Sequence, residues 1–219
     1  MIRPGSKSSA IIFNFQLSIF NLKGTPMIRI AEERDVPEIL SIYAPYVLNT
    51  TCTFEYDVPT EVAFLERFRS ITARFPWIVG EEDGRILGYA YGSSLFERAA
   101  YSWSCESSVY LRPEAKGRGI GRALYTVLEK ILALQGYMVN YAIVTSENSA
   151  SLAFHEKLGY RSAGVFTGCA FKFGKQLGIT WMEKEIKNAE IPSKFPDTWP
   201  FVRQDAEFFS YILDILSLF

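Results

Sequence analysis

One segment of the chain, residues 106–125, strongly limits how the chain can fold. Its first half is rich in strand-forming residues and ends at Pro113, which cannot donate a hydrogen bond to a sheet ladder. Three glycines then alternate with Arg118 and Ile120, so backbone N–H groups lie uncovered where a helix is expected to begin. Unpaired amides and the helix macrodipole both favour an anion at such a point. The segment therefore predicts an anion-binding turn between a strand and a helix.

This turn differs in spacing from the two most common phosphate-binding loops. Gly117, Gly119 and Gly121 give G-x-G-x-G instead of G-x-G-x-x-G, and no G-K-[ST] sequence follows. The turn also supplies side-chain cations, from Lys116, Arg118 and Arg122. A phosphate ligand of a different kind from those two loops is therefore expected.

Strand-like and helix-like apolar patterns alternate along the chain, which predicts an α/β or α+β fold with a central mixed β-sheet flanked by helices. Asp35 and Glu38 have the spacing of a capping box, Thr60 is placed to open a helix, and Asp83-Gly84 is a hairpin signal. The expected strands cover 28–31, 75–80, 85–91, 101–111, 137–145, 160–166 and 177–186. The expected helices follow residues 35, 60, 119 and 148, the third ending near Gly136 and the fourth stopped by Gly159.

The chain divides into three parts, of which only residues 27–186 have the pattern of the domain. Residues 1–26 form an N-terminal extension that we interpret as a non-native or mis-assigned leader, in preference to a secretory signal, because polar residues interrupt its apolar run. Residues 187–219 begin as a proline-punctuated linker and end in an apolar helix over 205–219. At about 15 residues this helix is too short to span a bilayer. We expect it to pack on the domain or on a partner chain, ahead of a membrane-surface role.

Composition excludes several classes of function. A net charge of -1 over 219 residues argues against a nucleic-acid surface, which needs a basic excess. Three cysteines without C-x-x-C spacing argue against a disulfide framework or a zinc site, and a single histidine argues against a His-based metal centre. No metal is therefore expected, and reduced thiols favour a cytoplasmic location.

Two motifs carry a resemblance to a known family. K-G-R-G-I-G at 116–121, after a strand ending V-Y-L-R-P, resembles the pyrophosphate loop of the GCN5-related N-acetyltransferases (GNAT), which bind acetyl-coenzyme A (acetyl-CoA). Residues 148–160 resemble the second signature of that family, and 101–110 resemble its phosphinothricin and methionine sulfoximine acetyltransferase branch. The resemblance covers about 27–186. It implies the GNAT acyl-CoA N-acyltransferase fold and direct transfer of acetyl from acetyl-CoA to the amino group of a small amino-acid-like acceptor.

The resemblance implies that acetyl-CoA lies along the end of the central strand, the turn and the helix after 148. Backbone amides near 109–111 would polarise the thioester carbonyl, and the turn would hold the pyrophosphate. Two departures from the branch pattern stand out: Lys116 replaces Gln or Arg, and Ser104-Cys105 replaces Thr-Val. The implied coenzyme-binding residues are Val109, Tyr110, Leu111, Lys116, Gly117, Arg118, Gly119, Ile120, Gly121, Arg122, Asn148 and Ser151.

Glu106 is the candidate general base. By the two-residue period of a strand it shares a face with Ser104, Ser108 and Tyr110, where desolvation would raise its pKa towards a useful range. The alternative is a carboxylate held by local hydroxyls and backbone. Cys105 falls on the opposite face, which argues against a covalent acyl-enzyme.

In the second motif, Asn148 is well suited to cap a helix, and His155 stands where most family members have tyrosine and the phosphinothricin branch has histidine. By resemblance His155 would protonate the leaving thiolate, with a structural histidine or a water as acid as the alternatives.

The resemblance also implies a set of acceptor-binding residues, each with an ordinary alternative as core aromatic or solvated charge. An arginine fork suits the anionic group of such an acceptor, and aromatic rings suit its apolar part. The set comprises Phe54, Glu55, Arg98, Tyr101, Trp103 and Lys172.

Other functions stay open at this point. An acetyltransferase of protein N-termini or aminoglycosides would need an open or acidic groove, and a non-catalytic acyl-CoA sensor would not need Glu106 and His155. An RNA-binding R-G-R-G module would need more than three clustered cations. The family resemblance also favours a homodimer, with a small-molecule amine as the only other partner.

Overall fold

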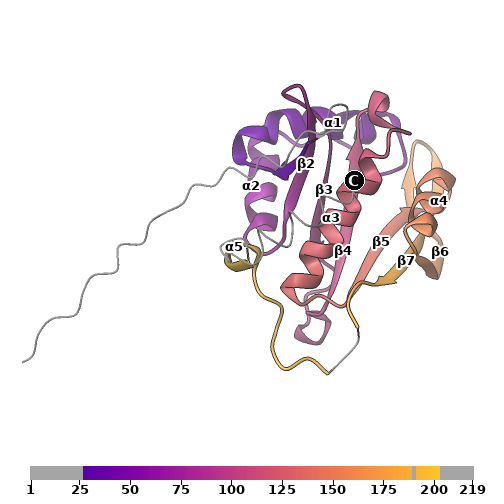
Figure 1. Ribbon diagram of the computed structural model, residues 1–219. Coiled ribbons are helices and arrows are strands. Elements are labelled where there is room, and N and C mark those ends of the chain that lie inside the picture. Colours follow the sequence, from indigo (N-terminus) through magenta and orange to yellow (C-terminus); the bar gives the residue numbers. More distant parts are fainter. Residues whose placement is uncertain (1–26, 189–190, 203–219) are drawn as a thin grey trace, which may run out of the picture.

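The computed structural model describes residues 27–188 and 191–202 (Figure 1). The expected leader and the expected helix over 205–219 lie outside the described residues. The strands are β1 (Met27–Ile30), β2 (Trp77–Glu82), β3 (Arg85–Ser94), β4 (Ser104–Leu111), β5 (Val139–Thr145), β6 (Arg161–Lys172) and β7 (Lys175–Glu185). The helices are α1 (Val36–Asn49), α2 (Glu61–Thr72), α3 (Ile120–Gln135), α4 (Ser149–Lys157) and α5 (Trp199–Val202), with short 3-10 turns η1 (Glu33–Asp35), η2 (Ala99–Tyr101) and η3 (Pro113–Ala115).

The seven strands form one mixed sheet in the order β1-β2-β3-β4-β5-β7-β6. All neighbouring pairs are antiparallel except β4 and β5, which are parallel. Asp83 and Gly84 have φ values of 51° and 76°, so the predicted hairpin between β2 and β3 is confirmed. The mixed sheet flanked by helices, expected from the sequence, is therefore present.

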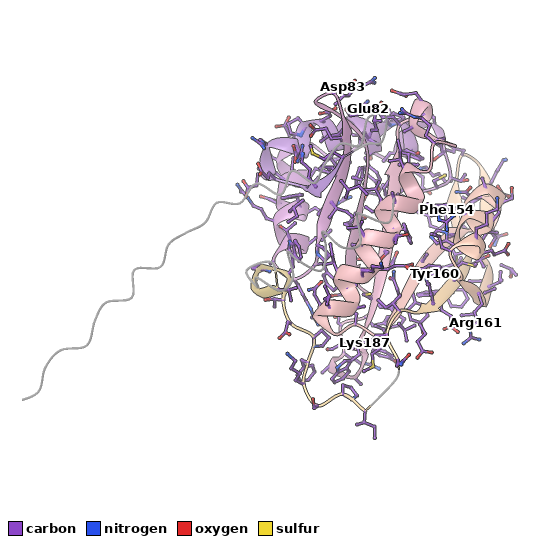
Figure 2. All side chains as sticks on the ribbon, in the orientation of Figure 1. Glu82, Asp83, Phe154, Tyr160, Arg161 and Lys187 are labelled. Carbon is purple, nitrogen blue, oxygen red and sulfur yellow. The ribbon has the colours of Figure 1, made fainter. Side chains whose placement is uncertain are left out.

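Different helices pack on the two faces of the sheet (Figure 1). Trp77 and Val79 pack with α1 and α2 on one face, whereas Ile78, between them in β2, packs with α3 on the other. A third cluster joins α3 and α4 to β5 and β7, on the α3 face. Figure 2 places Phe154 and Tyr160 in this region, where both rings contact Tyr125 of α3.

Some expected boundaries were wrong for identifiable reasons. The strand expected from 101 begins at Ser104, because Ala99–Tyr101 form η2. The Asp35–Glu38 capping box is not formed, since Asp35 accepts hydrogen bonds from Arg29 at 2.6 and 2.9 Å and Glu38 accepts one from the Ile86 amide at 2.9 Å. The Thr60 cap is confirmed by its 3.2 Å bond from the Ala63 amide.

Within the described residues, no helix is long and apolar enough to cross a membrane, and no cluster of three His, Cys, Asp or Glu side chains could hold a metal.

Gly88 allows β3 to lie close to the end of β4. A Cβ atom at this position would lie 2.8 Å from the carbonyl oxygen of Tyr110 and would overlap the Leu111 side chain. Gly88→Ala should therefore lower the free energy of unfolding by about 1–3 kcal/mol, the usual cost of overpacking. Urea denaturation measures this, with Gly164→Ala as the matched control, since nothing lies within 4 Å of a Cβ at Gly164. Equal effects of the two substitutions would contradict the close approach.

Candidate active site

The central feature of the site is the divergence of the two parallel strands. Only Ser104–Glu106 of β4 pair with Val139–Tyr141 of β5, although β4 continues to Leu111 and β5 to Thr145. The β3–β4 ladder, by contrast, runs without a register shift from Ser94 to Gly88. Beyond Glu106, β4 therefore lacks a strand partner on its β5 side. The interruption is an early end of the β4–β5 ladder, and there is no bulge between β4 and β3.

Two tyrosine hydroxyls contact polar groups of this unpaired backbone. The Tyr125 hydroxyl lies 2.9 Å from the Ser107 carbonyl oxygen, and the Tyr46 hydroxyl donates to the Leu111 carbonyl oxygen at 2.6 Å. The Leu111 amide also lies 3.3 Å from the Tyr46 hydroxyl oxygen. Of the three amides expected to polarise a carbonyl, that of Leu111 is thus already engaged, and that of Tyr110 points to β3, as the Arg112 amide does in its bond to the Leu87 carbonyl. This leaves the Val109 amide, which faces the unpaired side. Sequence reasoning missed both tyrosines, whose helical periodicity indicates only packing.

The glycine turn has the open geometry that an anion site requires. Gly117 and Gly119 have φ values of 75° and 82°, and no atom lies within 4 Å of a Cβ built on either. Gly119 is the N-cap of α3, so the unpaired amides of Ile120, Gly121 and Arg122 open the helix there. The turn follows β4 directly through η3.

The three cations of the turn are in different environments. Arg118 is paired with Glu82 at 2.6 Å, and Lys116 Nζ lies 5.3 Å from the centroid of the Tyr46 ring. Arg122 is exposed. Lys116 and Tyr46 also line a pocket of about 180 Å³ between α1 and the turn. Pockets for drug-sized ligands are larger, about 300–1,000 Å³, so a long ligand would extend beyond it along the surface.

Glu106 lies at the last β4–β5 pair, where its partner in register is Tyr141. Burial raises the pKa of its carboxyl to about 7, and no cation forms an ion pair with it in the described part of the chain. At neutral pH this carboxyl therefore exchanges a proton readily. Cys105 beside it is fully buried in the cluster under α3, so the predicted separation of Glu106 and Cys105 onto opposite faces is confirmed.

An aromatic surface extends from Glu106 across β5 and β7. Tyr141 contacts Trp181 of β7 at 6.3 Å between ring centroids, and Trp181 contacts Phe96 and Phe166 at 6.0 and 6.1 Å. Phe96 is in turn 4.8 Å from Tyr101. None of these rings belongs to the three buried clusters of the described residues. This half of the face that carries Glu106 is therefore not covered by a helix.

The loop between α1 and α2 lies beside the end of β6. Lys172 is 2% exposed and donates to the Thr53 carbonyl oxygen at 2.8 Å, which brings it next to Phe54 and Glu55. Glu55 is paired with Arg67 at 2.7 Å. Arg98 and Tyr101 lie on the β3–β4 loop, where Arg98 is exposed and Tyr101 is 44% exposed.

Trp103 is placed apart from the other expected acceptor-binding residues. Its ring stacks on Phe195 at 5.0 Å with an interplanar angle of 15°, and its indole N–H donates to the Lys194 carbonyl oxygen at 3.0 Å. The sequence pattern that groups it with Tyr101 does not reveal this contact with the C-terminal segment.

Asn148 caps α4, as predicted, by accepting a 3.2 Å hydrogen bond from the Ser151 amide. Its side-chain amide also donates to Cys52 Sγ at 3.2 Å, so α4 is connected to the α1–α2 loop. The cap thus fixes the N-terminus of α4 close to the end of β5.

His155 of α4 is 3% exposed, and both of its ring nitrogens contact protein atoms. Nδ1 lies 2.8 Å from the Ser151 carbonyl oxygen and must carry a proton there, because a carbonyl only accepts. Nε2 lies 2.9 Å from the Tyr125 hydroxyl, which is also in contact with the Ser107 carbonyl. Burial lowers the pKa of His155 and so favours its neutral form. Because Nδ1 holds the one proton of the neutral ring, Nε2 could pass a proton towards the β4 backbone, by way of Tyr125, only from the imidazolium form.

Comparisons with known proteins agree with this geometry. Residues 28–181 match the model of the acetyltransferase (GNAT) domain. The chain is 35% identical over 163 residues to a phosphinothricin N-acetyltransferase of Alcaligenes faecalis, covering 73% of this chain and 82% of that protein. It is 33% identical over 162 residues to an L-methionine sulfoximine/L-methionine sulfone acetyltransferase of Pseudomonas aeruginosa, covering 73% and 94%.

A solved structure gives the same result for the fold. A phosphinothricin acetyltransferase of Sinorhizobium meliloti, in complex with acetyl-CoA, superposes with a TM-score of 0.75 at 33% identity, covering 80% of this chain and 97% of that one. With the splayed strands, the open glycine turn and these matches together, the chain belongs to the GNAT family of acetyltransferases.

Proposed function

We propose that this protein transfers the acetyl group of acetyl-CoA to the amino group of a small amino-acid-like acceptor, such as phosphinothricin or methionine sulfoximine. The observation that carries the proposal is the position of Glu106 at the last β4–β5 pair, with unpaired strand backbone and an open anion turn following it. The names of the relatives supply the acceptor class.

The coenzyme would bind in two parts. The pyrophosphate would accept hydrogen bonds from the amides at the start of α3, with Lys116 and Arg122 adding charge. The pantetheine arm carries amide groups that would pair with the backbone of β4 beyond Glu106, where a strand partner is missing. Asn148 and Ser151, at the N-terminus of α4, would border the other side of the arm.

Catalysis would then proceed by direct transfer. Glu106 removes a proton from the ammonium group of the acceptor, and the free amine attacks the thioester carbonyl carbon. The amide of Val109, which faces the unpaired side of β4, would stabilise the developing oxyanion, because a fixed donor costs no reorganisation. Collapse of the intermediate breaks the C–S bond, and the released thiolate takes up a proton.

The acceptor would occupy the aromatic surface beside Glu106. Tyr101 and Trp181 offer apolar contacts, and the exposed Arg98 offers a cation for a carboxylate or phosphinate. Lys172, buried against the Thr53 carbonyl, would add its charge from behind the α1–α2 loop. Phe54 and Glu55 would close the side formed by the α1–α2 loop. Such a surface suits a small acceptor. A peptide or an aminoglycoside would need an open or acidic groove instead.

We further propose that the protein works as a homodimer in the cytoplasm. The support for a dimer is β6, an edge strand with Val165 and Phe166 more than half exposed. The support for a reducing compartment is that Cys52, Cys105 and Cys169 are all free thiols.

Glu106→Gln should lower kcat by about 100-fold or more, the usual contribution of a general base, with acetyl-CoA affinity kept within about twofold. In the wild type, kcat/KM for the acceptor should rise with pH and level off above about 7, because only the ionised carboxylate accepts a proton. A thiol-release assay across pH measures both. Cys105→Ala is the control from the opposite face and should retain turnover. Unchanged kcat in Glu106→Gln would remove Glu106 as the base.

Gly119→Val should weaken acetyl-CoA binding by at least about tenfold, because a side chain there strains a left-handed residue and covers the helix amides. Isothermal titration calorimetry measures the affinity. Gly174→Val is the matched control: Gly174 has φ of 72° and open space around it, but it lies in the β6–β7 hairpin. Normal affinity in Gly119→Val would contradict the assignment of the turn.

If His155 protonates the thiolate, it must act as the imidazolium, whose Nε2 proton passes through Tyr125. His155→Asn and Tyr125→Phe should then lower kcat by similar factors of about tenfold or more, and the double variant should be no slower than either single one. Single-turnover kinetics measures the chemical step. Full kcat in both single variants would leave water as the acid and His155 as a structural residue.

A further inference from the structure

The C-terminal residues 191–202, which we call the strap, lie outside the span matched by the family model, 28–181. Figure 2 shows Lys187, just before the strap, towards the end of the molecule opposite Glu82 and Asp83. Arg118 of the glycine turn pairs with Glu82. The strap and the glycine turn therefore lie towards opposite ends of the sheet.

The strap is attached to the domain at its C-terminal half. The Asp197 amide donates to the Gln135 carbonyl oxygen at 2.7 Å, and the Gln135 side chain donates back to the Asp197 carbonyl oxygen at 2.9 Å. The Trp199 amide donates to the Arg74 carbonyl oxygen at 3.0 Å, and the Trp199 side chain is 2% exposed within the cluster under α3. These contacts fix the path of the preceding residues, Lys194 and Phe195.

Those two residues contact only one aromatic side chain, Trp103, in the described residues. The stack and the indole hydrogen bond are independent contacts with different geometric requirements, so together they restrain both the position and the orientation of the Trp103 ring. The Trp103 carbonyl oxygen also accepts the Met138 amide at 2.8 Å. Trp103 is thus anchored by side chain and backbone together.

Trp103 ends the β3–β4 loop, residues 95–103, and stands three residues before Glu106. The same loop carries Arg98 and Tyr101, and its other aromatic contact is that of Phe96 with Trp181. Phe96 is 49% exposed despite this contact, so the loop buries little apolar area that could hold it in place. At this end of the loop the sheet holds the Trp103 backbone, and the strap holds the Trp103 ring.

We propose that the strap is a specificity element, in which Phe195 and Lys194 hold Trp103 and thereby fix the β3–β4 loop that receives the acceptor. Trp103 and Phe195 act as positioning residues and touch no reacting atom. The proposal rests on the proposed function for the identity of the acceptor site. It predicts that a weakened strap impairs acceptor binding without affecting the coenzyme end of β4.

The test compares Phe195→Ala with Phe195→Tyr, which keeps the ring, and with Ile191→Ala, an apolar truncation at a strap residue that is 98% exposed. Phe195→Ala should speed amide hydrogen exchange in 95–103 and raise KM for phosphinothricin and methionine sulfoximine about three- to tenfold, the size expected for one aromatic pair. KM for acetyl-CoA should stay within twofold. Phe195→Tyr should restore both readouts, and Ile191→Ala should alter neither.

Two results would overturn the proposal. The first is unchanged exchange in 95–103 for Phe195→Ala, and the second is an equal rise of both KM values, which indicates general destabilisation. Failure of the proposed function is separate, because it would appear as absence of turnover in the wild type. The exchange comparison would still decide whether the strap holds the loop.

Discussion

The structure depends on where the parallel ladder between β4 and β5 stops. Three residue pairs hold the strands together, and beyond Glu106 each continues without the other. Backbone groups that lose a sheet partner must be satisfied in another way. Tyr125 and Tyr46 engage the Ser107 and Leu111 ends of the gap, and between them Val109 directs its backbone N–H and C=O to the unpaired side. Because the last pair contains Glu106, the same divergence that leaves this backbone unpaired also places a carboxylate at its vertex. Under the proposed function, coenzyme binding and proton transfer would both follow from this one separation.

The environment of each residue of β4 depends on the face of the sheet it points to and on the end of the strand it lies near. Odd-numbered residues of β4, such as Cys105, pack under α3, whereas Glu106 lies on the other face, beside aromatic rings of β5 and β7 that no helix of the described residues covers. Burial among neutral groups raises the pKa of this carboxyl to about 7, while the pKa of Tyr91 nearby is raised to about 12, so that hydroxyl stays neutral. The glycine turn lies at one end of β4 and the strap at the other. The proposed coenzyme and acceptor sites can therefore be tested by separate substitutions.

The sequence predicted those parts of the fold that depend on local chemistry. Pro113 and the glycines after it indicated the turn, Asp83-Gly84 the hairpin, and Asn148 and Thr60 their helix caps, because each acts through its own backbone or the next turn. Long-range contacts could not be predicted in this way. Asp35 was expected to cap α1, but Arg29 binds it instead. Trp103 was grouped with Tyr101 by the family resemblance, which gave no sign that its ring lies against Phe195, 92 positions later in numbering. The roles of Tyr46 and Tyr125 depend on where two strands separate, which no local pattern shows.

Amide hydrogen exchange with and without acetyl-CoA tests the central claim most directly, because it reports on the backbone of β4 itself. If the coenzyme pairs with the unpaired side of this strand, acetyl-CoA should slow exchange at Val109 and at the first residues of α3. Exchange at 77–82 in β2, which is paired on both sides, should not change. Protection confined to other regions, with exchange at Val109 and at the start of α3 unaltered at saturating acetyl-CoA, would contradict the account.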